Sequence, residues 1–485
     1  MRLAELKGRR VLIVGGGLTG ASVARFLSRH AVAFDLVDDN GVPDTLAALV
    51  APGRVHERLD AALAAACDVL VLSPGVPRAH PAVRAALDAG VRVVGDVELF
   101  ASCVAAPLVA VTGSNGKSTV VAWLAELLGR LGIRAVACGN IGLPALDSLG
   151  EGATEESGGT PDCHVLELSS YQLESTTSLA PHAACVLNVS DDHLDRYASR
   201  AHYAAVKRRI YTHALHSVVN ADDPATEPAA NEANVRVRFT LRERDEANPP
   251  DEAGTGEAPE RPSGTLWHRA WIDGGPWLCR DGEALLAQSR LRVPGDHNAA
   301  NALVVLALLE SLGTAAGRFA EGAREGALEG TGEIVLGALC AFRGLPHRTE
   351  LVAEADGVRW YNDSKGTNVD ACIKAVGAMP GPVLLIAGGL SKGADFGPLR
   401  AVVARHAHAI VLIGRDRMRL HEALDGAAPL HLADSLDEAV GLCRALARSG
   451  DTVLLSPACA SFDMFRDFAD RGRRFVACVE EALAA

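Results

Sequence analysis

The sequence predicts an α/β protein of three domains, each built around a mostly parallel β-sheet. Short runs rich in Val, Leu and Ile alternate with helical stretches along the chain, the pattern of strands joined by crossover helices. The chain has 485 residues, and at ~150 residues per domain this length favours three domains. Apolar residues make up 48% of the chain, which is enough to fill several cores.

The predicted strands fall into three series, one for each domain. Their continuous apolar composition suits sheets that are covered on both faces. We predict strands at Arg10–Val14, Phe34–Val37, Val69–Leu72 and Arg92–Gly95; at Pro107–Thr112, His164–Leu168, Ala184–Asn188 and Ser217–Asn220; and at Val358–Tyr361, Val383–Ala387, Ala409–Ile413 and Thr452–Ser456. The corresponding domains cover residues 1–104, 105–343 and 344–485.

Two stretches depart from this alternation. Residues 241–265 are charged, rich in Pro and Gly and nearly free of large apolar side chains, so we expect a mobile surface loop. Residues 314–335 are rich in Ala and Gly and are expected to form a loosely helical connection before the last domain.

Charge and cysteine content exclude several classes of protein. A net charge of −13 argues against a nucleic-acid or membrane-surface binder, because both need a cationic surface. No apolar run reaches the ~20 residues of a membrane span, and the N-terminus lacks a signal-peptide pattern. We therefore expect a cytoplasmic protein. The 11 scattered cysteines contain no C-x-x-C pair, which favours reduced, mostly buried thiols.

A first glycine-rich loop, GGGLTG at 15–20, follows the first predicted strand and precedes a helix predicted at Ala21–Leu27. Its glycines permit a tight turn and let backbone amides approach a diphosphate at the helix N-terminus. Asp38 ends the second strand, where an acid that binds ribose would lie. Three interpretations stay open here: a packing turn, an NAD(P) site and a site for another nucleotide.

A second loop is more specific. Gly113-Ser114-Asn115-Gly116-Lys117-Ser118-Thr119 lies between a predicted strand and a helix predicted at Val120–Leu131. In such a loop the backbone amides cradle phosphate, Lys117 reaches the β and γ oxygens, and the Ser118 hydroxyl can bind Mg²⁺. The spacing is two residues shorter than the usual G-x-x-x-x-G-K loop. The middle domain is thus predicted to resemble a P-loop ATPase and to bind ATP.

This shorter loop, TGSNGKST, resembles the ATP loop of the Mur ligases and folylpolyglutamate synthetases, a family of three-domain ligases. The resemblance covers nearly the whole chain, and its further motifs are GNIGLP (139–144), LELSSYQLE (166–174), LNVSDDHLDRY (187–197), YAAVKRRIY (203–211), VNADD (219–223), GDHNAANAL (295–303), GLPHR (344–348), NDSKGTN (362–368), SKGADF (391–396) and LLSPACASFDMF (454–465). It implies an ATP-dependent ligase that activates a carboxylate as an acyl phosphate and captures it with an amino acid. Within the family it implies the addition of D-glutamate to UDP-N-acetylmuramoyl-L-alanine in peptidoglycan precursor synthesis.

Four residues are candidates for binding metal. Glu167 ends an apolar strand beside the P-loop strand, which suits a Mg²⁺ ligand opposite Ser118; a buried structural acid is the alternative. His193 taken singly would be a surface or capping residue, and the resemblance implies that it helps to bind a second Mg²⁺. Lys207 lies beside Arg208 and could belong to a solvated basic face. The resemblance instead implies that Lys207 is carbamoylated.

The resemblance also implies the residues that bind the three substrates. Asn298 and Asn301 lie three apart on one predicted helix face and could bind adenine, although Asn298 could instead cap the helix. Arg348 and Asp363 resemble residues of the last domain that reach ATP. The residues that bind the glutamate substrate would be Thr367, Lys392, Ser461 and Phe468. The first, Rossmann-like domain would bind the UDP part, and the residues assigned to the nucleotide-sugar substrate are Leu18, Thr19, Gly20, Asp38, Ser73, Asn140 and Ser169. Asp39 and Asn40 depart from related ligases.

Several alternatives remain at this point. The chain could be a related ligase that uses another amino acid or L-glutamate, because both glutamate isomers need the same ion types. The first glycine loop alone would suit an NAD-dependent oxidoreductase, which leaves the second loop unexplained. A non-catalytic module switched by ATP is a third alternative. We expect a monomer, because each active site would be complete within one chain.

Overall fold

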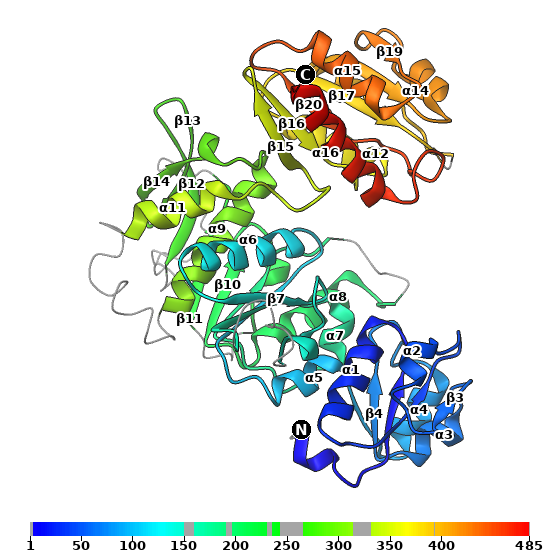
Figure 1. The fold of residues 1–485 in the computed structure, drawn as a ribbon. Helices are drawn as coiled ribbons and strands as arrows, with labels where there is room; N and C mark the ends of the chain where they lie inside the picture. Colours follow the sequence, from blue (N-terminus) through cyan, green and yellow to red (C-terminus); the bar gives the residue numbers. More distant parts are fainter. Residues whose placement is uncertain are drawn as a thin grey trace. The chain divides into compact units, whose positions relative to one another are not determined.

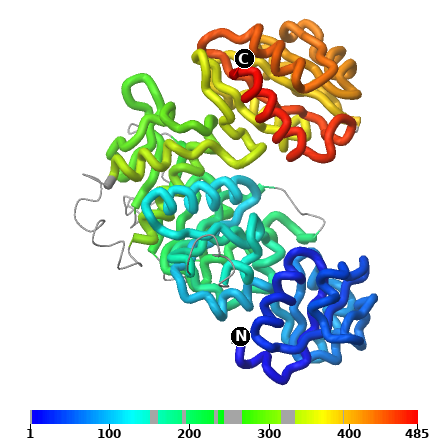
Figure 2. The backbone as a smooth tube through the Cα atoms, in the orientation of Figure 1, coloured from blue at the N-terminus to red at the C-terminus, as the bar shows by residue number. Residues whose placement is uncertain are grey.

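The computed structural model describes residues 3–149, 160–190, 196–229, 235–242, 265–313, 331–391 and 393–484. The chain forms two compact units. One comprises Met1–Leu285 and Asn301–Leu336, and the other comprises Leu286–Ala300 and Gly337–Ala485. In Figures 1 and 2 the chain is coloured from blue at the N-terminus to red at the C-terminus, and the two units are described separately below.

The first unit begins with a five-stranded parallel sheet of order β3-β2-β1-β4-β5. Alternate residues of β1 enter different cores: Val11 and Ile13 join one apolar cluster, and Leu12 and Val14 join another. Both faces of the sheet are therefore covered, as the apolar strands predicted. The elements are η1 (Leu3–Leu6), β1 (Val11–Val14), α1 (Leu18–Arg29), β2 (Phe34–Val37), α2 (Asp44–Ala47), β3 (Val55–His56), α3 (Ala61–Ala66), β4 (Val69–Leu72), α4 (Pro81–Asp88), β5 (Arg92–Val94) and α5 (Asp96–Ala101).

The strand order of this sheet reverses between β1 and β4. From β1 the chain builds outward through β2 and β3, and it then crosses to β4 on the other side of β1. Open α/β sheets bind ligands at such a reversal, beyond the carboxyl ends of the strands. The loops that follow β1 and β4 therefore mark the ligand position of this sheet.

The first unit also contains most of a nine-stranded sheet of order β14-β13-β12-β11-β10-β9-β6-β8-β7. The segment Leu286–Ala300, with the end of β14, all of η6 and the start of α9, belongs to the second unit, as does α11 from Gly337 onward. Strand β6 lies between β8 and β9 and is parallel to both, so the loops after these strands open at one edge. Strands β12 and β13 pair as an antiparallel hairpin. The elements are β6 (Leu108–Thr112), α6 (Lys117–Arg130), β7 (Ala135–Gly139), η2 (Ala145–Leu149), β8 (Cys163–Glu167), α7 (Ser170–Glu174), β9 (Ala183–Val186), α8 (Arg200–Arg208), η4 (Arg209–Tyr211), β10 (His216–Asn220), η5 (Pro224–Thr226), β11 (Val235–Thr240), β12 (Leu266–Ile272), β13 (Gly275–Arg280), β14 (Glu283–Ala287), η6 (Gln288–Arg290), α9 (Asp296–Gly313) and α11 (Thr331–Ala341).

The second unit holds a six-stranded sheet of order β15-β16-β20-β17-β18-β19. Strands β15 and β16 pair antiparallel, and the other neighbours pair parallel. Both faces of this sheet are again apolar: Leu385 joins one core cluster and Leu384 the other. The elements are β15 (Glu350–Ala355), β16 (Val358–Asn362), α12 (Val369–Ala378), β17 (Val383–Gly388), α13 (Leu399–His406), β18 (Ala407–Ile413), α14 (Arg417–Leu424), β19 (Leu430–Leu432), α15 (Leu436–Leu446), β20 (Thr452–Leu455) and α16 (Phe468–Ala484).

The α/β fold and the predicted strands are confirmed, each strand to within a few residues at its ends. The sequence reasoning missed β3, β7, β15 and β19 and the run of strands from β11 to β14, most of which are short or carry polar side chains. Two helices begin earlier than predicted, α1 at Leu18 and α6 at Lys117, because both glycine loops lead directly into their helices. Each sheet lies within one of the predicted ranges 1–104, 105–343 and 344–485; the boundaries themselves stay a prediction.

The structure also bears on the expectations for the cysteines, the two irregular stretches and membrane crossing. All 11 cysteines are free, nine of them buried, as expected for reduced thiols. Burial raises the pKa of the Cys67 thiol to about 11. Most of the expected loop 241–265 and of the expected connection 314–335 lies outside the described residues; the last residues of the latter begin the helix α11. Among the described helices, none combines the length and apolar character that a bilayer crossing needs.

Candidate active site

The loop after β6 has the geometry of a phosphate cradle. Gly113 and Gly116 have φ angles of +152° and +87°, which favour glycine. A Cβ atom on Gly113 would lie 2.9 Å from Cβ of Leu187, and one on Gly116 would lie 2.8 Å from Oδ1 of Asn301. Gly116 is also the N-cap of the 14-residue helix α6, where backbone amides and the helix dipole favour an anion.

Two lysines converge on this loop. Nζ of Lys117 donates to the backbone carbonyls of Gly113 (2.8 Å) and Ser114 (2.9 Å). Nζ of Lys207 donates to the same Gly113 carbonyl (2.9 Å) and lies 3.4 Å from Oγ1 of Thr112. Lys207 is only 1% exposed, so the alternative of a solvated basic face is wrong for this residue. Its ammonium lies 4.5 Å from the centre of the Tyr203 ring, a cation–π contact.

Glu167 lies at the end of β8, in register with Val111 on β6. Its side chain is 2% exposed. Oε1 accepts a hydrogen bond from Nδ2 of Asn140 (2.8 Å), whereas Oε2 is buried and has no hydrogen-bond partner among the described residues. A buried carboxylate oxygen without a partner is costly in a folded protein. A hard cation such as Mg²⁺ would satisfy it, so this residue fits the predicted metal role.

Asn140 and Ser169 were predicted to contact the nucleotide-sugar substrate. Asn140 is exposed, and its amide holds the Glu167 carboxylate. Ser169 is the N-cap of α7, and its side chain and that of Gln172 form a capping box. Both residues therefore stand beside the Glu167 strand end.

Buried Asp96 was missed by the sequence reasoning. Its Oδ2 accepts a hydrogen bond from Nε2 of Gln172 (3.4 Å), and Oε1 of that glutamine accepts from the Ser169 amide (3.1 Å). A carboxylate can only accept, so Asp96 fixes which way the Gln172 amide faces. Burial raises the pKa of Asp96 to about 6.

Asn188 is a further residue that the sequence reasoning missed. Its carbonyl accepts from the Ser114 amide and its Oδ1 accepts from the Asn115 amide, both at 2.9 Å. The Oγ of Ser114 in turn accepts from the amide of Ser190 (3.0 Å). The phosphate loop is thus held from the chain that follows β9. Asn188 lies in one of the motifs named above. It was missed because the strand was predicted to end at Asn188, whereas β9 ends two residues earlier, at Val186.

Asn298 and Asn301 are on one helix, α9, as predicted, and both are buried. Nδ2 of Asn298 donates to the carbonyl of Pro294 (2.8 Å), just before the helix begins; a capping side chain would instead accept from backbone amides, so this contact does not support the capping alternative. Asn301 is the one that approaches the phosphate loop, through Gly116.

The first glycine loop is shaped by close packing. A Cβ atom on Gly20 would lie 1.8 Å from the carbonyl oxygen of Gly15. Oγ of Ser73, in the loop after β4, donates to that carbonyl (3.3 Å). The Asp38 carboxylate accepts from the amides of Gly16 (2.6 Å) and Asn40 (2.8 Å). Leu18 and Thr19 open α1 beside this loop, and Leu18 is 83% exposed.

In the second unit, Asp363 follows β16. Its Oδ2 accepts from Oγ of Ser456 (2.8 Å) after β20, and its Oδ1 accepts from the amide of Thr349 (3.2 Å). Burial raises the pKa of Asp363 to about 6, against the lowering effect of these hydrogen bonds and of the exposed Arg348 nearby. Arg348 and Asp363 therefore lie near each other in this unit; that they reach ATP stays a prediction.

The residues of this unit that were predicted to bind the glutamate substrate lie near the same strand ends. Thr367 is exposed, Ser461 is buried, and Phe468 begins α16. The ring of Phe468 lies 5.2 Å from Nζ of Lys365. Two predicted residues, His193 and Lys392, lie outside the described residues.

Arg471 connects the loops that carry these residues. It is 1% exposed, and burial lowers the pKa of its guanidinium to about 10. Nε donates to Oγ of Ser364 (3.0 Å), Nη2 donates to the Ser364 carbonyl (2.9 Å), and Nη1 and Nη2 donate to the Cys459 carbonyl (3.2 Å each). Arg471 could not be singled out from the sequence, because Arg473 and Arg474 follow it on the same helix.

Comparisons with known proteins identify the family. Three family models match the chain: a MurD-like Mur ligase N-terminal domain at 9–95, a Mur ligase middle domain at 111–309 and a Mur ligase glutamate ligase domain at 347–459. The UDP-N-acetylmuramoylalanine–D-glutamate ligase of Nitrosococcus oceani is 44% identical over 98% of this chain and 97% of its own length. The chain is a Mur ligase. The protein of the same name from Thiobacillus denitrificans is 43% identical over 99% of this chain and 98% of its own.

Solved structures share the fold of this Mur ligase at low identity. A UDP-N-acetylmuramoyl-L-alanyl-D-glutamate–2,6-diaminopimelate ligase superposes with a TM-score of 0.53 at 14% identity, covering 86% of this chain and 92% of its own. MurF ligase from Thermotoga maritima, in complex with ADP, gives 0.51 at 14% identity, covering 99% and 96%. These similarities support the α/β architecture of this Mur ligase, and the roles of its residues rest on the geometry above.

Proposed function

We propose that this Mur ligase joins D-glutamate to UDP-N-acetylmuramoyl-L-alanine at the expense of ATP, in the cytoplasmic synthesis of peptidoglycan precursors. Full-length identity above 40% to relatives that bear this ligase name carries the proposal. The phosphate loop beside a buried carboxylate is the machinery that such a reaction needs. The γ-phosphoryl group of ATP passes to the L-alanyl carboxylate and releases ADP. The D-glutamate amine then attacks the acyl phosphate, and inorganic phosphate leaves as the amide forms.

The loop at 113–119 and the start of α6 bind the ATP phosphates in this proposal. Lys117 leaves the Gly113 and Ser114 carbonyls and donates instead to the β and γ oxygens, where a cation stabilises the charge that develops during transfer. Asn298 and Asn301 bind the adenine base in this proposal. Arg348 supplies a planar guanidinium for the γ-phosphate, and Asp363, hydrogen-bonded beside it, positions the loop that follows β16.

Glu167 and Ser118 hold Mg²⁺ in this proposal, together with His193 and a carbamoylated Lys207. The unpaired Oε2 of Glu167 is the observation that supports a cation here. Two Mg²⁺ ions would neutralise the phosphate and carboxylate oxygens and so bring two anions together. Asn140 keeps the Glu167 carboxylate oriented through its hydrogen bond to Oε1.

Carbamoylation of Lys207 would convert a buried cation into an oxygen donor. Its Nζ is buried beside the phosphate loop, 2.9 Å from the Gly113 carbonyl. The neutral amine is the form that reacts with CO₂. Intact mass measured in bicarbonate should show one added CO₂, which Lys207→Arg abolishes; an active enzyme that never carries the adduct contradicts the modification.

The first sheet binds the UDP moiety at the reversal between β1 and β4. The diphosphate lies at the start of α1, near Leu18, Thr19 and Gly20, and Ser73 borders it from the neighbouring loop. Asp38 supports the loop through Gly16, so its remaining lone pairs are those available to a ribose hydroxyl. In the second unit, Thr367, Lys392, Ser461 and Phe468 bind D-glutamate. We expect the chain to act as a monomer.

Phosphate release by the purified protein tests the function. With ATP, Mg²⁺ and UDP-N-acetylmuramoyl-L-alanine present, we expect release that depends on D-glutamate and falls to background with L-glutamate. Omission of the nucleotide substrate is the control for uncoupled ATP hydrolysis. Equal release with L-glutamate or with another amino acid would assign the chain to a related ligase. No release with any amino acid would refute a ligase.

A further inference from the structure

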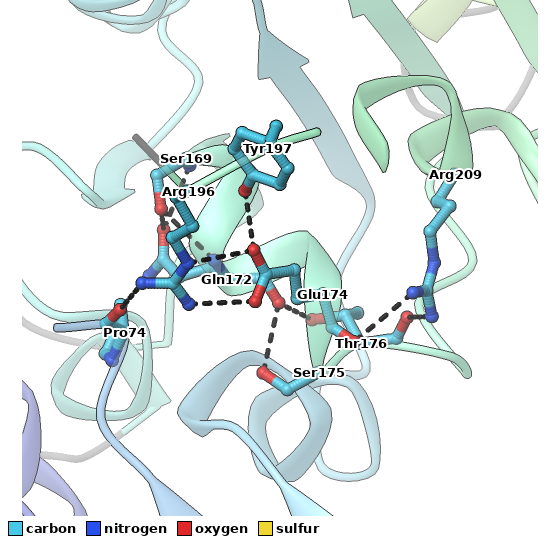
Figure 3. Close-up of polar contacts among 9 residues, drawn as sticks. All are labelled: Pro74, Ser169, Gln172, Glu174, Ser175, Thr176, Arg196, Tyr197 and Arg209. Atoms are coloured by element: carbon cyan, nitrogen blue, oxygen red, sulfur yellow. Dashed lines mark hydrogen bonds and ion pairs between the residues drawn. The ribbon is translucent and has the colours of Figure 1, made fainter. Parts of the chain in front are cut away.

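A half-buried arginine, Arg196, connects two parts of the first unit: the loop after β4 and the helix α7. Nε and Nη2 of Arg196 form a two-pronged ion pair with Glu174, at 3.1 Å to Oε1 and 2.8 Å to Oε2. Nη1 donates to the carbonyl of Pro74 (3.0 Å). The guanidinium carbon lies 3.9 Å from the centre of the Tyr171 ring. Figure 3 shows the guanidinium between the Glu174 carboxylate and Pro74.

The geometry of this cluster is specific to arginine. All three nitrogens of the Arg196 guanidinium donate, and its plane stacks on Tyr171, whereas a lysine ammonium offers one point charge and no plane. The side chains of Arg196 and Glu174 are 12% and 14% exposed, so solvent screens the pair weakly. Oε1 of Glu174 also accepts from the hydroxyl of Tyr197 (2.6 Å). Burial of Tyr197 and this hydrogen bond both raise the pKa of the tyrosine.

The Pro74 end of the cluster lies at the substrate loop of the first sheet. Pro74 follows Ser73, whose hydroxyl is bound to the Gly15 carbonyl in the loop after β1. These loops border the reversal of strand order, where the sheet is expected to hold its ligand. A shift of the Pro74 carbonyl would therefore move one wall of the nucleotide-sugar site.

The Glu174 end lies at the phosphate-transfer site. Glu174 is the last residue of α7, the helix whose N-cap, Ser169, follows Glu167 by two residues. Arg196 thus holds the loop after β4 against a short helix that starts beside the proposed metal carboxylate. The phosphate loop itself has separate support from Asn188, so loss of Arg196 should leave it in place.

We propose that Arg196 is a positioning residue that sets the place of the UDP-N-acetylmuramoyl-L-alanine substrate relative to the phosphate-transfer site. This inference rests on the proposed function. Arg196 acts through Pro74 and Glu174. Its loss weakens the binding and alignment of the nucleotide substrate and spares the affinity for ATP. A misalignment of about 1 Å can lower a reaction rate by roughly 100-fold, so a fall of about 10- to 100-fold in kcat/KM for the nucleotide substrate is expected.

The test compares Arg196→Gln and Arg196→Lys with Arg209→Gln. Arg209 donates to the carbonyls of Glu174 (3.2 Å) and Thr176 (2.8 Å) at the same C-terminal end of α7, so its variant perturbs this end of the helix and leaves Pro74 alone. Steady-state KM is measured for each of the three substrates. The Kd of UDP-N-acetylmuramoyl-L-alanine is measured by isothermal titration calorimetry, which needs no turnover.

For Arg196→Gln we expect a KM and Kd for the nucleotide substrate at least about tenfold higher, with the KM for ATP within twofold of the wild type. Arg196→Lys should resemble it, and Arg209→Gln should stay near the wild type. The proposal is overturned if the nucleotide Kd is unchanged, if all three KM values rise together, or if Arg209→Gln has the same effect. Should Arg196→Gln not fold, Glu174→Gln and Arg196→Lys decide by the same readouts. A wild type that binds the nucleotide but releases no phosphate would refute the proposed function alone.

Discussion

The substitution Arg471→Met tests how the second unit is held together. The Arg471 guanidinium donates to the backbone carbonyls of both Ser364, after β16, and Cys459, after β20. Methionine has a similar length and no donors. It removes four hydrogen bonds from a site in which Ser364 is fully buried. The two carbonyls are left without these donors in the interior.

The magnitude follows from these contacts. A buried acceptor deprived of its donor costs about 1–3 kcal/mol, which gives ~2–6 kcal/mol for two carbonyls. Removal of a buried charge offsets part of this, at ~1–2 kcal/mol, because the guanidinium had been taken out of water. We therefore expect Arg471→Met to destabilise the second unit by about 1–4 kcal/mol.

Hydrogen-exchange mass spectrometry is the appropriate assay, because it reports each unit separately. Peptides from β16, β20 and α16 should exchange roughly 5- to 1,000-fold faster in the variant, as ~1–4 kcal/mol implies. Peptides from the first sheet serve as an internal reference and should be unchanged. Arg473→Ala is the matched control: Arg473 is exposed on the same helix, 3.5 Å from Asp470. Exchange within threefold of the wild type in Arg471→Met, or an equal effect of Arg473→Ala, refutes the reasoning.

Three further predictions concern the other sites. Lys117→Ala should lower phosphate release by at least about 100-fold with an unchanged circular dichroism spectrum, because the γ-phosphoryl group loses its cation; release above a tenth of the wild type contradicts this role. Gly20→Ala places a Cβ atom 1.8 Å from the Gly15 carbonyl and should cost about 1–3 kcal/mol in thermal unfolding, whereas Gly129→Ala, in open space on α6, should be neutral or stabilising. The raised pKa of Asp96, about 6, means that the folded protein keeps a proton that the unfolded chain has released above pH ~4, so stability falls as pH rises through this interval. Asp96→Asn should therefore gain ~2–3 kcal/mol over the wild type between pH 4 and pH 7 in urea unfolding, and a constant difference would contradict the raised pKa.

Much of the candidate site could be predicted from the sequence because its signals are local. The phosphate loop at 113–119 needs glycines, a lysine and a hydroxyl in a fixed order between one strand and one helix. Glu167 could be placed beside it because neighbouring parallel strands bring their carboxyl ends to one edge. Those two placements required only the periodicity of the strands and the chemistry of phosphate.

The roles of single charged residues were less predictable. Lys207, Arg208 and Arg209 are adjacent, and the structure buries Lys207 while it leaves Arg209 exposed. Arg471 is buried and Arg473 is not, on one helix. Spacing along a helix limits which residues share a face, but the face that is covered depends on segments that are distant in the chain.

By itself, the sequence determined the α/β class, most of the strands and both glycine loops, because these depend on neighbouring residues and on backbone geometry. Only the tertiary structure decided which carboxylates and cations lose water: Glu167 with one oxygen unpaired, Asp96 behind Gln172, and Arg196 between Pro74 and Glu174. Desolvation sets the strength of a charge and its pKa, and it is a property of everything packed around the residue.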